Sequence, residues 1–180
     1  MVAKKKRIMS AEDIERSLNR MALQIMEKNK GNKNLAIVGI YTGGIYLADR
    51  LKRIIKAREN IDLQVGSLDI TLYRDDWSLA SQNPVVKKTD INFKVDGYTL
   101  VLVDDVVFTG RTIRAALDAI MDFGRPCFIQ LAVLIDRGGR ELPIQPDFVG
   151  MSLNVNANEH INVLLEEYSG SSEVVLESFS

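Results

Sequence analysis

The sequence has little of what marks a secreted, membrane-bound or disulfide-linked protein. It contains one cysteine among 180 residues, so no disulfide can form within the chain. No apolar run approaches the roughly 20 residues that span a bilayer, and no apolar stretch of the kind found in a secretory signal follows the basic segment 4–7. We therefore expect a cytoplasmic protein without membrane contact. Cys127 lies in the apolar run 127–135 and is predicted to be a small buried hydrophobe.

Neither sign of charge dominates the chain. There are 23 Lys and Arg against 24 Asp and Glu, with a formal net charge of −1 and a pI near 5.9. Nucleic-acid binding through a strongly basic overall surface is therefore unsupported, and only a local basic face remains open. No Cys and His cluster suggests zinc, and the single histidine, His160, is predicted to be exposed at a strand edge. The length and the 46% of hydrophobic residues predict one domain over residues 1–180.

Strand and helix patterns alternate along the first three quarters of the chain. Ser10 and the acids after it predict a helix start, and apolar residues recur at helical spacing to Lys30. Short continuous apolar runs, typical of buried parallel strands, alternate with such helices. This order predicts an α/β fold with a mostly parallel central sheet and helices on both faces. The expected strands are 35–40, 63–72, 98–103 and 127–135, and the later helices follow 41–44 and run from Thr109 to about Phe123.

Two segments depart from this alternation. The polar stretch at about 73–96 is too long for an ordinary connection and is predicted to be a flexible lid over a binding site. At about 136–180, prolines and glycines precede short strand patterns, which predict a small β-rich hood over the carboxyl edge of the sheet. The candidate strands of this hood are 147–153, 161–167 and 173–176.

The richest candidate site follows the strand predicted to end at Val103, because ligands of open parallel sheets bind at the carboxyl ends of the strands. Asp104 and Asp105 come next, and Thr109 then opens a helix whose free N–H groups can hold a phosphate. A ribose 5-phosphate would match both the acidic pair and the helix start. Thr109 and Thr112 would donate hydrogen bonds to its phosphate, and the two carboxylates would accept them from its diol. The same carboxylates face the positive charge that builds at an anomeric carbon during substitution.

Other interpretations of this segment remain open. An acidic pair can simply end a strand and Thr-Gly can simply cap a helix, although the joint pattern is less ordinary. Acidic pairs also follow strands in P-loop ATPases and in response-regulator receivers. The chain has no G-x-x-x-x-G-K-[ST] sequence, and a receiver places its acidic pair near the start of its domain. Both of these classes are therefore disfavoured.

With these residues, the sequence resembles the type I phosphoribosyltransferases, and in particular the PyrR family of pyrimidine-operon attenuation proteins with uracil phosphoribosyltransferase activity. The resemblance runs from about Ser10 to Gly150 and implies the type I phosphoribosyltransferase fold. It also implies that uracil and 5-phosphoribosyl 1-pyrophosphate (PRPP) give UMP and pyrophosphate with Mg²⁺. The matching segments are LDITLYRDD at 68–76, VLVDDVVFTGRT at 101–112, AALDAIMDFGRP at 115–126, IQLAVLIDRG at 129–138 and RELPIQPDFVG at 140–150.

The resemblance also implies a role for each part of the site. Asp104, Asp105 and Arg74 are the expected catalytic residues, and the two aspartates are expected to meet the metal through water or ribose hydroxyls. Uracil is expected to contact Arg137, Phe148 and Val149. The expected phosphoribosyl- and phosphate-binding residues are Val106, Val107, Phe108, Thr109, Gly110, Arg111 and Thr112.

The chain departs from the family pattern in the pyrophosphate loop, which here is Thr42, Gly43 and Gly44. Two basic side chains usual in that loop are missing. Each charge-assisted contact is worth about 1.5–3 kcal/mol, so turnover is expected to be about ten- to a hundredfold weaker. Purine relatives place an Asp where Phe108 stands, and its absence agrees with a pyrimidine substrate.

A regulatory role is the second activity that the resemblance implies. The family binds a messenger-RNA hairpin of the pyrimidine operon and responds to UMP or UTP. Arg20 and Arg140 match the RNA-binding positions, while neighbouring positions carry fewer cations. A homodimer or homotetramer is expected. The alternatives are a nucleotide-sensing regulator with decayed catalysis and a purine-type phosphoribosyltransferase.

Overall fold

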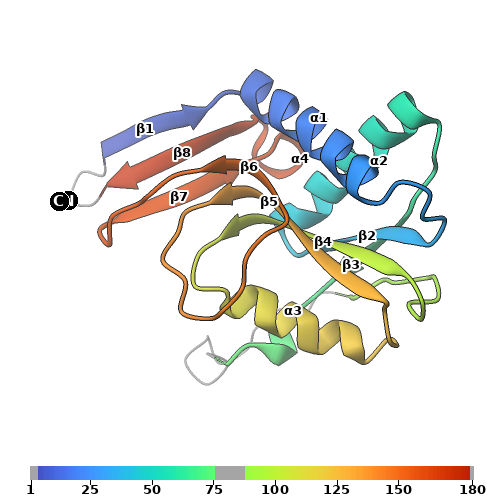
Figure 1. Ribbon diagram of the computed structural model, residues 1–180. Coiled ribbons are helices and arrows are strands. Elements are labelled where there is room, and N and C mark those ends of the chain that lie inside the picture. The colour runs from blue at the N-terminus through green and yellow to red at the C-terminus, as the bar shows by residue number, and fades with distance from the viewer. Residues whose placement is uncertain (1–3, 76–87, 179–180) are drawn as a thin grey trace.

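The computed structural model describes residues 4–75 and 88–178 and contains a five-stranded sheet in the order β3-β2-β4-β5-β6 (Figure 1). All four neighbouring pairs of strands are parallel. The apolar runs of the sequence form the middle strands, and every residue of β2 is buried. The predicted α/β fold with a parallel sheet is confirmed. The strands are β2 (Leu35–Ile40), β3 (Gln64–Leu68), β4 (Thr99–Val107), β5 (Phe128–Asp136) and β6 (Phe148–Ser152).

Helices cover both faces of this sheet. The helices α1 (Ala11–Lys28) and α2 (Gly43–Glu59) lie on one face, and α3 (Arg111–Met121) lies on the other (Figure 1). The alternation of β4 explains the two cores: Val101 and Val103 pack on the α1 and α2 side, whereas Leu100 and Leu102 pack on the α3 side. The carboxyl end of β4 therefore lies between two packed cores. This packing holds the residues at that end in place.

The helix α1 begins where its sequence predicts. The Ser10 hydroxyl accepts a hydrogen bond from the Asp13 N–H at 3.2 Å, and the Asp13 carboxylate accepts one from the Ser10 N–H at 2.9 Å. This reciprocal capping box satisfies two N–H groups at the helix start. The helix ends at Lys28, two residues before the predicted end. Its buried side carries Ile14, Ser17, Leu18, Met21, Ala22 and Ile25.

A second, antiparallel sheet has the strand order β1-β8-β7, formed by β1 (Lys4–Met9), β8 (Glu173–Ser178) and β7 (Glu159–Leu164), with the short helix α4 (Glu166–Ser169) between β7 and β8. This sheet is the predicted β-rich element, with one correction: β6, assigned to the hood, belongs to the main parallel sheet. His160 lies exposed on the edge strand β7, as predicted.

Two local predictions were wrong. The strand expected at 63–72 ends at Leu68, because the chain turns there into a 3-10 helix, η1 (Thr71–Tyr73). Cys127 is exposed, because it precedes β5 at the amino end of the sheet, outside both cores. Half of the lid predicted at 73–96, residues 76–87, lies outside the described residues, so the lid stays a prediction. Within 4–75 and 88–178, no helix has the length and apolarity needed to cross a bilayer.

Candidate functional site

A cavity of about 350 Å³ opens at the carboxyl edge of the parallel sheet. The segments that follow β2 and β3 and the end of β4 contribute to its wall, as the topology of a parallel sheet predicts. The fold brings together residues that are up to 71 positions apart in the sequence, from Tyr41 to Thr112. The residues that line the cavity are Tyr41, Thr42, Asp69, Ile70, Thr71, Arg74, Asp104, Asp105, Val106 and Thr112.

The acidic pair lies inside β4, which continues to Val107, whereas the sequence predicted a strand that ends at Val103. Asp104 still pairs with Val133 of β5, and its carboxylate accepts a hydrogen bond from the Asp105 N–H at 2.9 Å. The Asp105 carboxylate accepts one from the Val106 N–H at 2.8 Å. Each side chain is thus bonded to the next amide along the strand, which orients the two carboxylates. Because neighbouring strand residues point to opposite faces, the pair presents carboxylate oxygens on two sides of the strand end.

Burial changes the ionisation of this pair. Asp104 is 5% exposed, and burial raises its pKa well above the ordinary value, with a further contribution from the charge of Asp105. Burial also raises the pKa of Asp105. Desolvated carboxyl groups that line a cavity are stabilised when a ligand donates hydrogen bonds to them. Two such groups side by side favour a ligand with adjacent hydroxyls or a positive charge.

The phosphate-loop segment begins α3, with one correction to the predicted cap. Gly110, not Thr109, is the residue before the helix, and its φ of 93° lies in the left-handed region that favours glycine. The Thr109 hydroxyl accepts from the Arg111 N–H at 3.3 Å instead. The first helical bond runs from the Arg114 N–H to the Gly110 carbonyl. The preceding N–H groups lie outside the helical ladder, as do the N–H groups that bind anions at other helix starts.

A smaller cavity of about 180 Å³ adjoins this helix start and shares Arg74 and Thr112 with the main cavity. Arg111 borders it and is held by two carboxylates, Asp75 at 2.5 Å and Glu141 at 2.7 Å. The side chain of Arg111 therefore connects three segments of the chain. Thr112 and the acidic pair, which the sequence predicts to act on one ligand, line the same cavity.

The predicted pyrophosphate loop joins β2 to α2, and its two glycines leave α2 pressed against β4. A Cβ atom on Gly43 would lie 2.4 Å from Oδ2 of Asp105, and one on Gly44 would lie 2.2 Å from the Val103 carbonyl oxygen. Thr42 lines the cavity, and the peptide bond between Tyr41 and Thr42 is cis. Glycine is required here because no side chain fits between the helix start and the strand.

The residues predicted to meet a base are split by the structure. The Arg137 guanidinium lies 3.9 Å from the centroid of the Phe108 ring, which is 44% exposed. The ring of Phe148, by contrast, is 4% exposed and packs in the core under α1, where Lys28 lies over it. Strand alternation turns the Phe148 ring into the core, so the predicted contact of Phe148 with uracil is corrected for its side chain. Val149 is partly buried against the α3-side core.

Comparison with known proteins agrees with this geometry. The phosphoribosyl transferase domain family matches residues 5–169. The bifunctional protein PyrR of Pelotomaculum thermopropionicum is 52% identical over 176 residues, which are 98% of this chain and 97% of that relative. The chain belongs to the PyrR family. Bifunctional protein PyrR of Thermoanaerobacter pseudethanolicus is 53% identical over 172 residues, with 96% of this chain and 97% of the relative covered.

Solved structures show the same fold at low sequence identity. The hypoxanthine phosphoribosyltransferase of Trypanosoma cruzi has a TM-score of 0.73 at 17% identity and covers 97% of both chains. A hypoxanthine-guanine phosphoribosyltransferase from Bacillus anthracis has a TM-score of 0.70 at 20% identity, with 99% of this chain and 100% of that chain covered. The type I phosphoribosyltransferase fold is thus confirmed for this PyrR family member.

The two arginines predicted to bind RNA in this PyrR family member make contacts within the chain. Arg20 of α1 donates to the carbonyl oxygens of Val149, at 3.3 Å, and Gly150. Arg140 forms an ion pair with Asp136 at 2.8 Å and donates to the carbonyl oxygens of Phe108 and Ile144, both at 2.9 Å. Its side chain is 18% exposed. Arg140 therefore ties the loop after β5 to the phosphate-loop segment.

Sequence reasoning missed Asp69 and Thr71, which line the cavity beside Arg74. Asp69 is 8% exposed. Its Oδ1 accepts from the Thr71 N–H at 2.9 Å and from the Thr71 hydroxyl at 2.5 Å. The signal was present, because Asp69 directly follows β3 and the acidic pair lies near the carboxyl end of β4. The predicted strand ran on to Leu72 and concealed that position.

Proposed function

We propose that this chain is a uracil phosphoribosyltransferase and a UMP- or UTP-responsive regulator that binds pyrimidine-operon messenger RNA. The relatives named bifunctional protein PyrR support both halves of the proposal. The observation that carries the enzymatic half is the convergence of the acidic pair and the start of α3 on one cavity of about 350 Å³. The proposal treats residues 1–180 as one phosphoribosyltransferase domain with a lid at about 73–96.

In the proposed reaction, N1 of uracil attacks C1 of PRPP while the bond between C1 and the diphosphate oxygen breaks. Pyrophosphate leaves, and the proton from N1 passes to the leaving group or to water. Asp104 and Asp105 accept hydrogen bonds from the ribose hydroxyls and stabilise the positive charge that develops at C1. Thr109, Thr112 and the first N–H groups of α3 hold the 5′-phosphate. Arg74 faces the diphosphate.

The residues of the site fit Mg²⁺, which the proposal assigns to the diphosphate. In the described residues, no group of three Asp, Glu, His or Cys side chains is placed to hold a metal by itself. Mg²⁺ commonly keeps several waters and binds through one or two carboxylates plus substrate phosphates. The buried pair Asp104 and Asp105 supplies such oxygens, directly, through water or through the ribose. When bound, the metal neutralises charge on the leaving diphosphate.

The base is proposed to lie beside Phe108 and Arg137, with the backbone of Val149 nearby. An apolar ring stands at position 108, so no carboxylate is offered there to a purine imidazole. This observation favours a pyrimidine over the purine-type alternative. The solved relatives named hypoxanthine phosphoribosyltransferases support the fold, and their low identity carries no argument about the base.

Incubation with labelled uracil, PRPP and Mg²⁺ tests the enzymatic half. We expect UMP, formed about ten- to a hundredfold more slowly than by relatives with two basic residues in the pyrophosphate loop, because each lost contact is worth about 1.5–3 kcal/mol. Nucleotide binding without UMP would favour the sensor with decayed catalysis. Faster turnover of hypoxanthine than of uracil would favour the purine type.

RNA binding is tested separately, by titrating salt against the protein and its own upstream pyrimidine-operon transcript. Contacts to phosphates predict that affinity decreases steeply as salt rises. Arg20 and Arg140 already bind carbonyl oxygens within the chain, so these two residues are expected to contribute only a small part of that decrease. Indifference to the transcript would contradict the regulatory half. A homodimer or homotetramer is proposed from the family and is tested by light scattering.

A further inference from the structure

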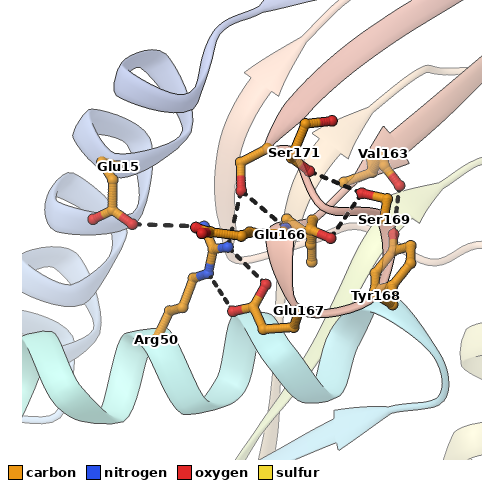
Figure 2. A network of polar contacts seen from close by, with 10 residues as sticks. Glu15, Arg50, Val163, Glu166, Glu167, Tyr168, Ser169 and Ser171 are labelled. Carbon is orange, nitrogen blue, oxygen red and sulfur yellow. Dashed lines mark hydrogen bonds and ion pairs between the residues drawn. The ribbon is translucent and has the colours of Figure 1, made fainter.

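One side of α2 is held by residues 166–172, which connect β7 to β8 and are called here the C-terminal brace. Arg50 of α2 donates two hydrogen bonds to the Glu167 carboxylate, at 2.8 and 2.7 Å, and one to the Ser172 hydroxyl at 3.0 Å (Figure 2). Glu15 of α1 adds an ion pair at 3.6 Å. The Arg50 side chain is 11% exposed and the Glu167 side chain 26% exposed, so the arginine end of this fork-shaped contact is the more shielded from solvent.

A second contact joins the brace to α2 closer to the cavity. The rings of Tyr46 and Tyr168 have centroids 5.5 Å apart, and the Tyr168 hydroxyl donates to the Val163 carbonyl at 2.5 Å (Figure 2). Burial raises the pKa of Tyr168, and the negative charge of Asp105 adds to the increase. The brace therefore lies within electrostatic reach of the acidic pair, although it contributes no residue to the cavity lining.

The inner side of α2 has no free space. Gly43 and Gly44 lie directly against Asp105 and Val103, with room for no side chain between helix and strand. The start of α2 therefore cannot move toward β4. Movement away from β4 is opposed by the contacts of Tyr46 and Arg50 with the brace. These two opposing sets of contacts fix the distance between the pyrophosphate loop and the Asp105 carboxylate.

We propose that the C-terminal brace positions the start of α2 against Asp105, so that Arg50, Glu167 and Tyr168 set the geometry in which the site binds the diphosphate of PRPP. The inference rests on the proposed function, because it takes PRPP as the ligand. The three side chains are positioning residues that act through α2. The antiparallel sheet thereby has a direct mechanical connection to the site through the turn between two of its strands.

The test compares the dissociation constant of PRPP with Mg²⁺, measured by calorimetry, in the parent chain and in Glu167→Ala and Tyr168→Leu. Each variant is expected to raise the constant about tenfold, since the loss of one charge-assisted contact to the diphosphate changes a dissociation constant by about that factor. Tyr168→Phe keeps the ring and should restore most of the affinity. Asp62→Asn is the matched control, because it removes ion pairs with Lys52 and Lys56 at the far end of the same helix.

The thermal midpoint of each variant separates positioning from stability. A lower midpoint in Glu167→Ala with an unchanged dissociation constant would overturn the inference, as would an equal loss of affinity in the Asp62→Asn control. If Glu167→Ala does not fold, Arg50→Lys is the milder variant, since it keeps the charge and loses the fork, and it must also weaken PRPP binding. A parent chain that binds PRPP without making UMP contradicts the proposed function alone. A parent chain that binds no PRPP contradicts both.

Discussion

Gly43 and Asp105 are in contact so close that a methyl group on the glycine would lie 2.4 Å from the carboxylate oxygen Oδ2. Gly43 begins α2, and Asp105, 62 positions later in the chain, lies near the carboxyl end of β4. Their contact joins the pyrophosphate loop to the acidic pair, the two places that we propose bind the diphosphate and the ribose of PRPP. Changes at either residue should therefore affect binding at both.

Gly43→Ala tests this contact directly. Alanine is favoured over glycine in helices by about 0.8–1.0 kcal/mol, so an open site would be stabilised by the change. We expect instead that the free energy of unfolding decreases by at least about 1 kcal/mol, because an extra methyl group in a packed site forces its neighbours into strained positions. We also expect weaker PRPP binding. Urea unfolding and calorimetry measure the two effects. A variant as stable as the parent, with equal PRPP affinity, would show that the contact relaxes easily.

Asp104→Asn should change how stability depends on pH. Burial raises the Asp104 pKa well above its ordinary value, so the folded protein holds this proton more tightly than the unfolded chain does. Stability therefore decreases as pH rises from the ordinary pKa, about 3.9, through the raised pKa of the folded state. The amide variant loses this term, so its advantage over the parent should grow with pH. Urea unfolding at several pH values measures it, and an advantage that shrinks would refute the assignment.

Arg137→Lys should weaken uracil binding with little effect on PRPP. The planar guanidinium stacks over Phe108 at 3.9 Å, and a lysine ammonium does not reproduce that geometry. We expect the KM for uracil to rise about tenfold, which corresponds to the ~1–2 kcal/mol of a partly desolvated cation–π contact. The KM for PRPP serves as the internal control. Equal increases in both constants would place Arg137 outside the base site.

Arg140→Gln should destabilise the fold. The guanidinium is 18% exposed and bonds to Asp136 and to the carbonyl oxygens of Phe108 and Ile144. Loss of charged hydrogen bonds of this kind costs about 2 kcal/mol, measurable by urea unfolding. Arg16→Gln is the control, because its exposed pair with Glu12 is worth less than about 1 kcal/mol. Similar effects of the two substitutions would mean that Arg140 is only a surface charge.

The sequence predicted those parts of the fold that depend on continuous burial. The run 35–40 became β2 without change, and Ser10 with Asp13 capped α1, because both patterns are local and strong. The strand β1 was missed because its four consecutive cations conceal any alternation. As an exposed edge strand, β1 is held by pairing with β8 and by the contact of Lys5 with Glu177 at 2.7 Å. Lysines on such an edge also oppose pairing with another chain.

The sequence predicted the chemistry of the site better than its exact geometry. Asp104, Asp105 and Thr112 all line the cavity, because residues at the carboxyl ends of parallel strands converge there. The side chain of Phe148 points into the core instead. Successive residues of a strand point to opposite faces, and a sequence motif does not show which face a given residue takes. The brace around Arg50 joins residues more than 100 positions apart, which no local pattern predicts.

The most direct test of the account is the affinity of the parent chain and of the Asp104→Ala, Asp105→Ala double variant for PRPP in the presence of Mg²⁺, measured by calorimetry. If the two carboxylates hold the ribose hydroxyls, the double variant should bind at least about tenfold more weakly, because each charged hydrogen bond contributes about 1.5–3 kcal/mol. A folded double variant that binds PRPP as tightly as the parent would contradict the account.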